Sequence, residues 1–359
     1  MHKEISFIVK LTNDCNLNCP YCYHFKHNGD KRELHMKMDT IEQTIRQLIN
    51  HNKHNAHFIW HGGEPMLLGL DVFRQIVQLQ KKYCKPDMNI SNAIQTNGTL
   101  LTDEWIIFFV ENDFHVGISV DGYKELHMKS RAVHESAFNL ILEKIKKLNQ
   151  AAARFGVLTV IGKNTLGHAD ELLQFFIESG INDIGFLPST VVNDGEIDHN
   201  CTLTAEEYGQ FLIDFFDVWV NSGKTGMSIR EFDEYFRSKL KVRHRLCINS
   251  NECDRYYTVT PDGKIYLCDC FPLEAESYVG SIFDPVDAVL SNNATIDSFR
   301  EHFKSPPSAC KACSFKKICN GGCKYYRWLA NKEMNRPHLY CSAFKQLYKQ
   351  MDEVIGEIH

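Results

Sequence analysis

Three cysteines near the start of the chain have the spacing of a metal-binding loop. Cys15, Cys19 and Cys22 form a C-x3-C-x2-C triplet directly after the apolar stretch ISFIVKL, for which we predict a β-strand. Soft thiolates favour iron–sulfur clusters or zinc. A [4Fe–4S] cluster takes four thiolates, so a triplet leaves one iron open for a substrate or cofactor. A structural zinc knuckle completed by a nearby histidine is the alternative.

A second group of cysteines lies in the C-terminal third. Its pattern is C-x5-C-x9-G-x4-C, a gap, C-x2-C-x5-C-x3-C, a gap, and a last cysteine: Cys247, Cys253, Gly263, Cys268, Cys310, Cys313, Cys319, Cys323 and Cys341. Eight thiolates make two complete sets of four, with no open iron. The segment YYTVTPDGKIYLCDC predicts a hairpin with Pro261-Asp262-Gly263 as its turn, which would bring Cys253 and Cys268 together. A pair of zinc ribbons is the alternative.

The elements that must position these residues alternate along the first two-thirds of the chain, which predicts parallel β/α units. We predict strands at Ile5–Lys10, His57–Trp60, Ile90–Gln95, Val116–Val120, Gly156–Ile161 and Ile184–Leu187. We predict helices at Asp39–Asn50, Asp71–Tyr83, Asp103–Asn112, Ala137–Gln150, Ala169–Ser179, Ala205–Asn221 and Ser342–Ile358. Asp39 and Thr102 are predicted N-caps.

The composition is that of a globular protein in a reducing compartment. The 359 residues are 43% hydrophobic and 24% charged, and the net charge of -5 argues against a nucleic-acid partner. No apolar run is long enough to span a membrane, and MHKEISFIVKL does not suit a signal peptide, so we expect a cytoplasmic protein without a membrane partner. The 14 cysteines are then not expected to form disulfides. We interpret the basic runs Lys144–Lys147 and Lys239–Arg245 as solvated faces.

Short polar motifs follow the predicted strands in order. They are His61-Gly62-Gly63-Glu64-Pro65, Gln95-Thr96-Asn97-Gly98 and Ser119-Val120-Asp121-Gly122. With the cysteine triplet and Tyr21, they resemble the radical S-adenosylmethionine (radical SAM) enzymes. In that family the open iron chelates SAM, and one electron cleaves SAM to a 5′-deoxyadenosyl radical that removes a hydrogen atom from the substrate. The resemblance implies an α/β fold with a partial (β/α)6 TIM-type barrel, whose functional loops follow the strands.

The same resemblance implies a SAM pocket built from these motifs. The Gly-Gly-Glu-Pro backbone would pair with the SAM amino group, and the later polar side chains would reach the ribose or carboxylate. The guanidinium of Arg131 suits the carboxylate. The implied cofactor-binding residues are Gly62, Gly63, Glu64, Pro65, Thr96, Asn97, Ser119, Asp121 and Arg131. Each polar residue could instead be a cap or a turn residue.

The C-terminal array resembles the SPASM domain of peptide-modifying radical SAM enzymes, which holds two auxiliary [4Fe–4S] clusters. The resemblance implies three [4Fe–4S] clusters and SAM as cofactors, and an electron donor of low potential, of the flavodoxin or ferredoxin type. It assigns Cys247, Cys253, Cys268 and Cys323 to the first auxiliary cluster, and Cys310, Cys313, Cys319 and Cys341 to the second. The expected domains are 1–230 (barrel), 231–345 (SPASM) and 346–359 (C-terminal helix). Cys84, Cys201 and Cys270 stay unassigned.

Within SPASM proteins, the cysteine spacings and segments such as HGGEPMLLGLDVF resemble the anaerobic sulfatase-maturating enzymes. Those enzymes oxidise a Cys or Ser of a sulfatase to formylglycine, so the resemblance implies a polypeptide substrate. It also implies a catalytic base directly after the third ligand of the first auxiliary cluster, which is Asp269 here. The alternative for Asp269 is a hydrogen bond that braces the cluster loop.

Some residues depart from that family. His61 stands where Gln is usual and Tyr123 where Pro is usual, and Tyr23 and His24 leave the family's substrate-facing Tyr missing or shifted. His61 is a second catalytic candidate that could orient the substrate, or else a core histidine. Because His is common there in SPASM enzymes that cross-link ribosomal peptides, thioether or carbon–carbon cross-linking is an alternative function. A radical SAM dehydrogenase of a small non-peptide substrate is another, whereas a simple electron carrier would need no SAM pocket.

Overall fold

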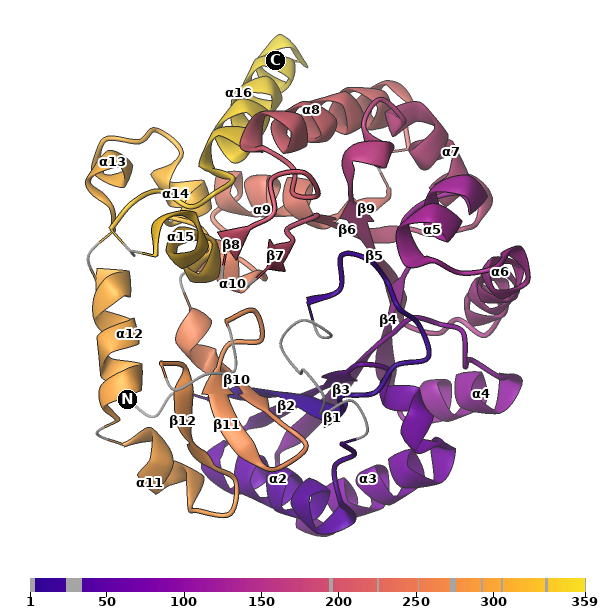
Figure 1. Ribbon diagram of the computed structural model, residues 1–359, viewed down its shortest axis with the longest axis vertical. Helices are drawn as coiled ribbons and strands as arrows, with labels where there is room; N and C mark the ends of the chain where they lie inside the picture. The colour runs from indigo at the N-terminus through magenta and orange to yellow at the C-terminus, as the bar shows by residue number, and fades with distance from the viewer. Residues whose placement is uncertain are drawn as a thin grey trace.

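Six parallel strands form a curved sheet at the centre of the structure. The structure is a computed structural model, and it describes residues 4–23, 34–193, 196–224, 226–250, 252–271, 276–291, 293–304, 306–332 and 335–358. They pair in chain order, as a partial barrel requires (Figure 1). The strands are β1 (Ser6–Thr12), β2 (Asn55–Gly62), β3 (Asn89–Thr96), β4 (Phe114–Ser119), β5 (Phe155–Ile161) and β6 (Asp183–Pro188). All six predicted strands are therefore confirmed, with ends shifted by a few residues.

Helices surround the outer face of this sheet (Figure 1). They are α2 (Met38–His51), α3 (Leu70–Tyr83), α4 (Asp103–Glu111), α5 (Lys124–Arg131), α6 (Glu135–Gln150), α7 (Ala169–Glu178) and α8 (Ala205–Asn221). Thr102 caps α4 as predicted, because its hydroxyl accepts from the Trp105 N–H. The prediction for Asp39 is wrong: Lys37 is the N-cap, and Asp39 lies in the first turn, where its charge favours the helix dipole. Helix α5 was not predicted.

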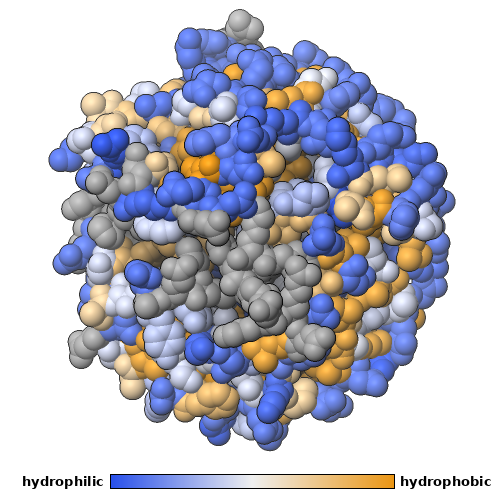
Figure 2. All heavy atoms as spheres, viewed as in Figure 1, coloured by the Kyte–Doolittle hydropathy of each residue, from blue (hydrophilic) through white to orange (hydrophobic). Residues whose placement is uncertain are grey.

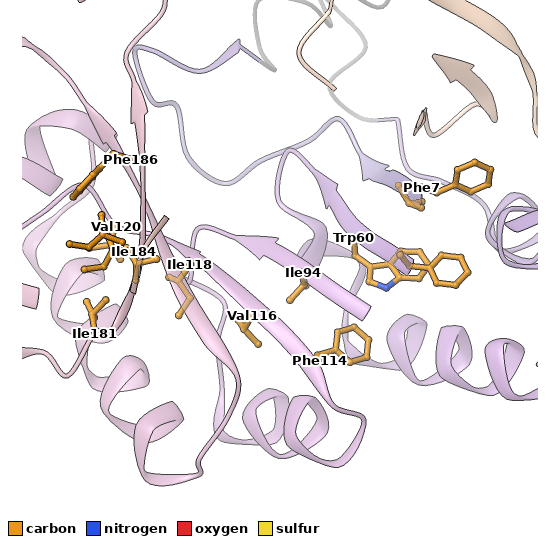
Figure 3. Packing of buried hydrophobic residues seen from close by; sticks show 14 of the residues in the cluster. Phe7, Trp60, Ile94, Phe114, Val116, Ile118, Val120, Ile181, Ile184 and Phe186 are labelled. Atoms are coloured by element: carbon orange, nitrogen blue, oxygen red, sulfur yellow. The ribbon is translucent and has the colours of Figure 1, made fainter. Parts of the chain in front are cut away.

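Strand residues alternate between a packed outer side and a polar inner side. On β1, Phe7 and Val9 are fully buried toward the helices, whereas Lys10 faces the inside of the barrel. On β2, Trp60 stacks on Phe58 with ring centroids 5.4 Å apart. Figure 3 shows Phe7, Trp60 and the labelled side chains of β3, β4 and β6 directed toward the helices. The core therefore lies between sheet and helices, and the inner face is left for chemistry.

The cysteine-rich region extends the barrel sheet. The predicted hairpin forms from β10 (Tyr256–Val259) and β11 (Lys264–Leu267), and β12 (Tyr278–Ser281) follows it antiparallel. β10 pairs in parallel with β1, so one sheet runs β12-β11-β10-β1-β2-β3-β4-β5-β6-β9, where β9 is Ser228–Ile229. The cysteine hairpin is thus fixed beside the strand that leads into the N-terminal cysteine loop.

Short helices complete this region and lie to one side of the barrel (Figure 1). They are α9 (Arg230–Lys239), α10 (Cys247–Ser250), α11 (Val286–Leu290), α12 (Ala294–Lys304), α13 (Ser308–Lys311), α14 (Lys316–Cys319) and α15 (Lys324–Asn331). The last helix, α16 (Cys341–Ile358), packs on α8. β7 (Val192–Asn193) and β8 (Glu196–Ile197) form a separate hairpin, and 3-10 turns lie at Pro65–Leu68, Lys163–Thr165 and Cys253–Arg255.

Most of the face seen in Figure 2 is hydrophilic, with smaller apolar patches between the outer elements. Among the residues that the structure describes, no helix is both long and apolar enough to cross a membrane.

Candidate active site

The loop after β1 gathers the three N-terminal cysteines. The thiols of Cys15, Cys19 and Cys22 lie close enough for their charges to interact. Burial raises the pKa of Cys15 to about 12 and that of Cys19 to about 11. A bound metal is what turns such buried thiols into thiolates, because it deprotonates its thiol ligands. Donor type, number and position therefore fit an iron–sulfur cluster with one open iron.

The two glycines at the end of β2, Gly62 and Gly63, are required by a close approach to this loop. The Gly63 N–H donates to the Thr12 carbonyl (2.8 Å), and a Cβ on Gly63 would lie 2.0 Å from the Asp14 carbonyl oxygen. Gly62 has φ +132°, which disfavours any other residue, and its Cβ would lie 2.3 Å from the Thr12 oxygen. In this structure the Gly-Gly turn therefore approaches the cysteine loop itself.

Glu64 joins the ends of β2 and β3. Its carboxylate is fully buried and accepts hydrogen bonds from the Thr96 hydroxyl (2.9 Å), the Asn97 N–H (2.8 Å) and the Met66 N–H (3.1 Å). Burial raises the pKa of Glu64 to about 7, although these donors oppose the shift. Glu64 and Thr96 thus connect the end of β2 to the end of β3, and Pro65 begins the short 3-10 turn that follows Glu64.

Asn97 and Ser119 lie at the ends of β3 and β4. The Asn97 amide donates to the Cys15 sulfur (3.8 Å) and to Asn16 Oδ1 (2.8 Å), so it touches the cysteine loop directly. The Ser119 hydroxyl accepts from the Gln95 amide (3.0 Å). Asn97 therefore lies against the cysteine loop, whereas Ser119 contacts Gln95 on the neighbouring strand.

The buried carboxylate of Asp121 accepts hydrogen bonds from three different segments of the chain. Its Oδ1 accepts from Arg131 Nη2 (2.9 Å) and the Val160 N–H (2.9 Å), and its Oδ2 accepts from the Tyr21 hydroxyl (2.5 Å). The Arg131 guanidinium lies 5.7 Å from the Tyr21 ring centre. Arg131 is 6% exposed, and its Nε has no hydrogen-bond partner among the described residues. A buried guanidinium with an unused donor beside the cysteine loop fits a carboxylate-bearing cofactor.

Asp269 lies where the cysteine hairpin meets the barrel. Its carboxylate pairs with Lys10 Nζ (2.9 Å) and accepts from the Tyr23 hydroxyl (2.6 Å). His61, opposite Lys10 in the β1–β2 pairing, is close enough to interact electrostatically with both Lys10 and Asp269. Burial lowers the pKa of His61, which keeps the imidazole neutral at pH 7. Four residues from four separate segments thus lie close together: Lys10, Tyr23, His61 and Asp269.

The sequence analysis missed Lys10 as a site residue and left Tyr23 as a shifted tyrosine. Lys10 is only 3% exposed, although lysine is rarely buried without a partner. A lysine inside an otherwise apolar strand was the available signal. Its partner lies 259 positions away along the chain, so pattern alone could not identify it.

The first auxiliary set of cysteines is brought together as the resemblance implied. Cys253, Cys268 and Cys323 all act electrostatically on the Cys247 thiol. Cys268 has φ +57°, and its N–H and carbonyl are held by Tyr256 and Thr258. Cys270 is exposed, and its N–H donates to the Cys268 sulfur (3.5 Å). Cys84 and Cys201 are also exposed.

The second auxiliary set surrounds one cavity. Its lining includes Cys310, Cys313, Cys319 and Cys341, with the rings of Phe315, Phe344 and Tyr348. Arg327 is fully buried near thiols of both auxiliary sets, and its Nη1 has no hydrogen-bond partner among the described residues. A buried cation suits anionic thiolate clusters on either side. Among the described residues, no three His, Cys, Asp or Glu side chains converge closely enough to hold a single metal ion.

Comparisons with known proteins agree with this geometry. Residues 9–176 match the radical SAM superfamily and residues 247–314 match the SPASM iron–sulfur cluster-binding domain. Over 97% of its length, the chain is 32% identical to the cysteine-type anaerobic sulfatase-maturating enzyme of Clostridium novyi, of which it covers 95%. The chain belongs to the anaerobic sulfatase-maturating enzymes. It is also 28% identical to the serine-type enzyme of Bacteroides thetaiotaomicron, over 94% of this chain and 86% of that enzyme.

Solved structures of this family superpose on the whole chain. One is native anSMEcpe with bound AdoMet and the Cp18Cys peptide, with a TM-score of 0.88 and 26% identity over 99% of both chains. The protein is therefore a radical SAM enzyme with a SPASM domain, and its cofactors are [4Fe–4S] clusters and SAM. The ligand and contact residues named above remain our predictions.

Proposed function

We propose that this sulfatase-maturating enzyme oxidises a cysteine side chain of a sulfatase polypeptide to formylglycine, with serine as a second target. The relative that it matches at 32% identity is a cysteine-type enzyme, and anSMEcpe has been solved with the Cp18Cys peptide. The single observation that supports the proposal most is the position of Asp269, between the N-terminal cysteine loop and the first auxiliary set.

In this proposal the chain's residues divide the work. Arg131, Asp121 and Asn97 bind and orient SAM beside Cys15, Cys19 and Cys22. Cys15, Cys19 and Cys22 would hold a cluster that, with SAM, would supply the radical for removal of the Cβ hydrogen of the target residue. Asp269 accepts the proton of the target thiol, since an ionised carboxylate is an acceptor at both oxygens. Lys10 balances its charge and Tyr23 fixes its orientation.

The proposal includes two accessory functions. The thiols of the auxiliary sets would hold the clusters that take up the electron released by the substrate. The resulting thioaldehyde then reacts with water, and the sulfur leaves as hydrogen sulfide. A donor of low potential, of the flavodoxin or ferredoxin type, supplies the electron for SAM cleavage.

The test is anaerobic incubation of the reconstituted enzyme with SAM, a chemical reductant, and a sulfatase-derived peptide carrying Cys, Ser or an aromatic target. Formylglycine is detected by mass spectrometry after hydrazide trapping, and 5′-deoxyadenosine is measured in parallel. Cys19→Ala is the control and should form neither product. A peptide that loses two hydrogens without forming an aldehyde would identify a cross-linking enzyme instead.

A further inference from the structure

The segment from Arg237 to Arg245 differs from the rest of the surface in both charge and apolar exposure. Its residues are RSKLKVRHR, and no acidic residue interrupts it, although the whole chain has a net charge of -5. Leu240 is 74% exposed and is the most exposed large hydrophobic side chain among the described residues, and Val242 is 47% exposed. Exposed apolar residues within a charged rim are typical of an interaction surface.

Several of its charges are not balanced locally. Lys239 pairs with Asp352, and Arg243 pairs with Glu252. Within the described part of the chain, no carboxylate lies within ion-pair distance of Lys241 or Arg245, although Asp233 is close enough to Arg245 for their charges to interact. The other basic run behaves differently, because Lys144 and Lys147 both pair with Asp103. The interpretation of Lys239–Arg245 as a solvated face therefore does not account for its exposed apolar residues.

The segment borders a hollow of about 400 Å³ that is also rich in arginine. Four arginines line this hollow, against two glutamates: Arg237, Arg243, Arg245, Arg255, Glu4 and Glu252. The Glu4 carboxylate is occupied by His54 and Asn55. The field of this region is consequently positive, and it would attract an acidic partner.

The backbone of the segment is held in place. The Val242 N–H donates to the Arg237 carbonyl (2.8 Å), which closes the end of α9. The Glu234 carboxylate accepts from the Arg245 N–H (2.8 Å), the Leu246 N–H (3.1 Å) and His244 Nδ1 (2.5 Å). A surface that is already ordered loses less conformational freedom on binding.

The position of the segment indicates the kind of partner. Arg245 lies two residues before Cys247, which belongs to the first auxiliary set, so their Cα atoms are within about 7 Å of each other. We propose that the segment Arg237–Arg245 is the docking surface for the acidic electron carrier of low potential, and that it places this carrier beside the first auxiliary cluster. The proposal rests on the proposed function for the need of a carrier. Each encounter transfers one electron: the carrier is oxidised by one electron and the first auxiliary cluster is reduced by one. This cluster would pass the electron on to the SAM cluster before it accepts the electron that the substrate releases.

The experiment measures the binding of an acidic flavodoxin to the cluster-loaded enzyme under anaerobic conditions, at low and high salt. Lys241→Glu/Arg245→Glu should raise Kd by about tenfold or more at low salt, because it reverses two exposed charges that form no close ion pair. Lys81→Glu/Lys146→Glu makes the same change of net charge on α3 and α6, and should change Kd by less than about twofold. High salt should weaken wild-type binding, since exposed charges are screened.

The enzyme assay separates this proposal from the proposed function. With flavodoxin as donor, 5′-deoxyadenosine formation by Lys241→Glu/Arg245→Glu should fall in line with binding, whereas with dithionite it should stay at the wild-type level. If wild-type enzyme fails to cleave SAM with dithionite, the proposed function is lost, but the binding comparison still decides the docking surface. If the charge-reversed variant loses iron, Lys241→Gln/Arg245→Gln replaces it, with an expected rise in Kd of about threefold.

Three results would overturn the docking surface. The first is equal affinity of the wild type and Lys241→Glu/Arg245→Glu for flavodoxin. The second is an equal loss of affinity in the control Lys81→Glu/Lys146→Glu, and the third is wild-type binding that does not respond to salt. The surface would be reassigned to a nucleic-acid partner on one further result. A single-stranded oligonucleotide would have to bind more tightly than flavodoxin, and Lys241→Glu/Arg245→Glu would have to lose only the oligonucleotide binding.

Discussion

Replacing Asp269 should have two separable effects, one on stability and one on catalysis. The Lys10–Asp269 pair has a separation of 2.9 Å, and Lys10 is 3% exposed. At an effective dielectric of about 20, two unit charges at that distance attract by roughly 6 kcal/mol, which desolvation partly offsets. Asp269→Asn leaves the Lys10 ammonium buried without its counter-ion, and this should cost about 3–5 kcal/mol.

A companion change at Lys10 isolates the stability effect. Lys10→Met removes the unpaired ammonium, so the double variant Lys10→Met/Asp269→Asn should be more stable than Asp269→Asn alone. The order of the thermal unfolding midpoints of the cluster-loaded proteins tests this, and the coupling follows from the double-mutant cycle. Asn at 269 can still accept the Tyr23 hydrogen bond, so the cluster content should be retained.

Catalysis should not recover with stability. Asn cannot take the substrate proton, and a positioned base contributes about 10²–10⁴ in rate. Both Asp269→Asn variants should therefore cleave SAM but form at least about 100-fold less modified peptide. If the double variant regains wild-type product formation together with stability, Asp269 is a structural brace and its assignment as the base is wrong.

Two more outcomes can be measured on the same preparations. Cys15→Ala/Cys19→Ala/Cys22→Ala should lose one cluster, or about four irons of about twelve, and stoichiometric zinc without labile sulfide would contradict the cluster assignment. Burial and the nearby Arg131 lower the pKa of His127 to about 4. As the pH falls, the unfolded chain therefore protonates this histidine before the folded chain does. The free energy of unfolding should then decrease from pH 6.5 to pH 4 by up to about 1.4 kcal/mol per pH unit. His127→Gln should flatten this part of the pH profile, and an unchanged slope would contradict it.

The sequence predicted well those elements that are determined by residues close together in the chain. Helix α8 has the bounds predicted for it, since Thr204 and Glu207 form a capping box directly before a periodic apolar run. The hairpin at Pro261-Asp262-Gly263 likewise follows from turn chemistry. Helix α5 was missed because it is short and mostly polar, although it carries both His127 and Arg131. Its formation depends on burial of those side chains against Asp121.

Contacts between distant segments could not be predicted in this way. The spacing of Cys15, Cys19 and Cys22 is local to one loop and indicates a metal site, whereas the division of the eight C-terminal cysteines into two sets followed only from the resemblance to the SPASM domain. The pairing of β10 with β1 depends on the register between strands about 250 residues apart. That register sets Tyr256 beside Ser6 and Val259 beside Val9, and so decides which inner-face residue of β1 meets Asp269. The choice of Lys10 is therefore a property of the folded sheet.

The continuous sheet also gives a physical reason why the proposed base, Asp269, would lie on the cysteine hairpin. Sites built on strands are held more accurately than sites on free loops. β1 leads directly into the N-terminal cysteine loop, and its neighbour β10 belongs to the hairpin that carries Cys268 and Asp269. The Lys10–Asp269 pair then ties the hairpin's end to the strand before that loop. A shift of β10 against β1 would move the base, Cys268 and the substrate position together, so we expect substitutions in this pairing to affect product formation more than SAM cleavage.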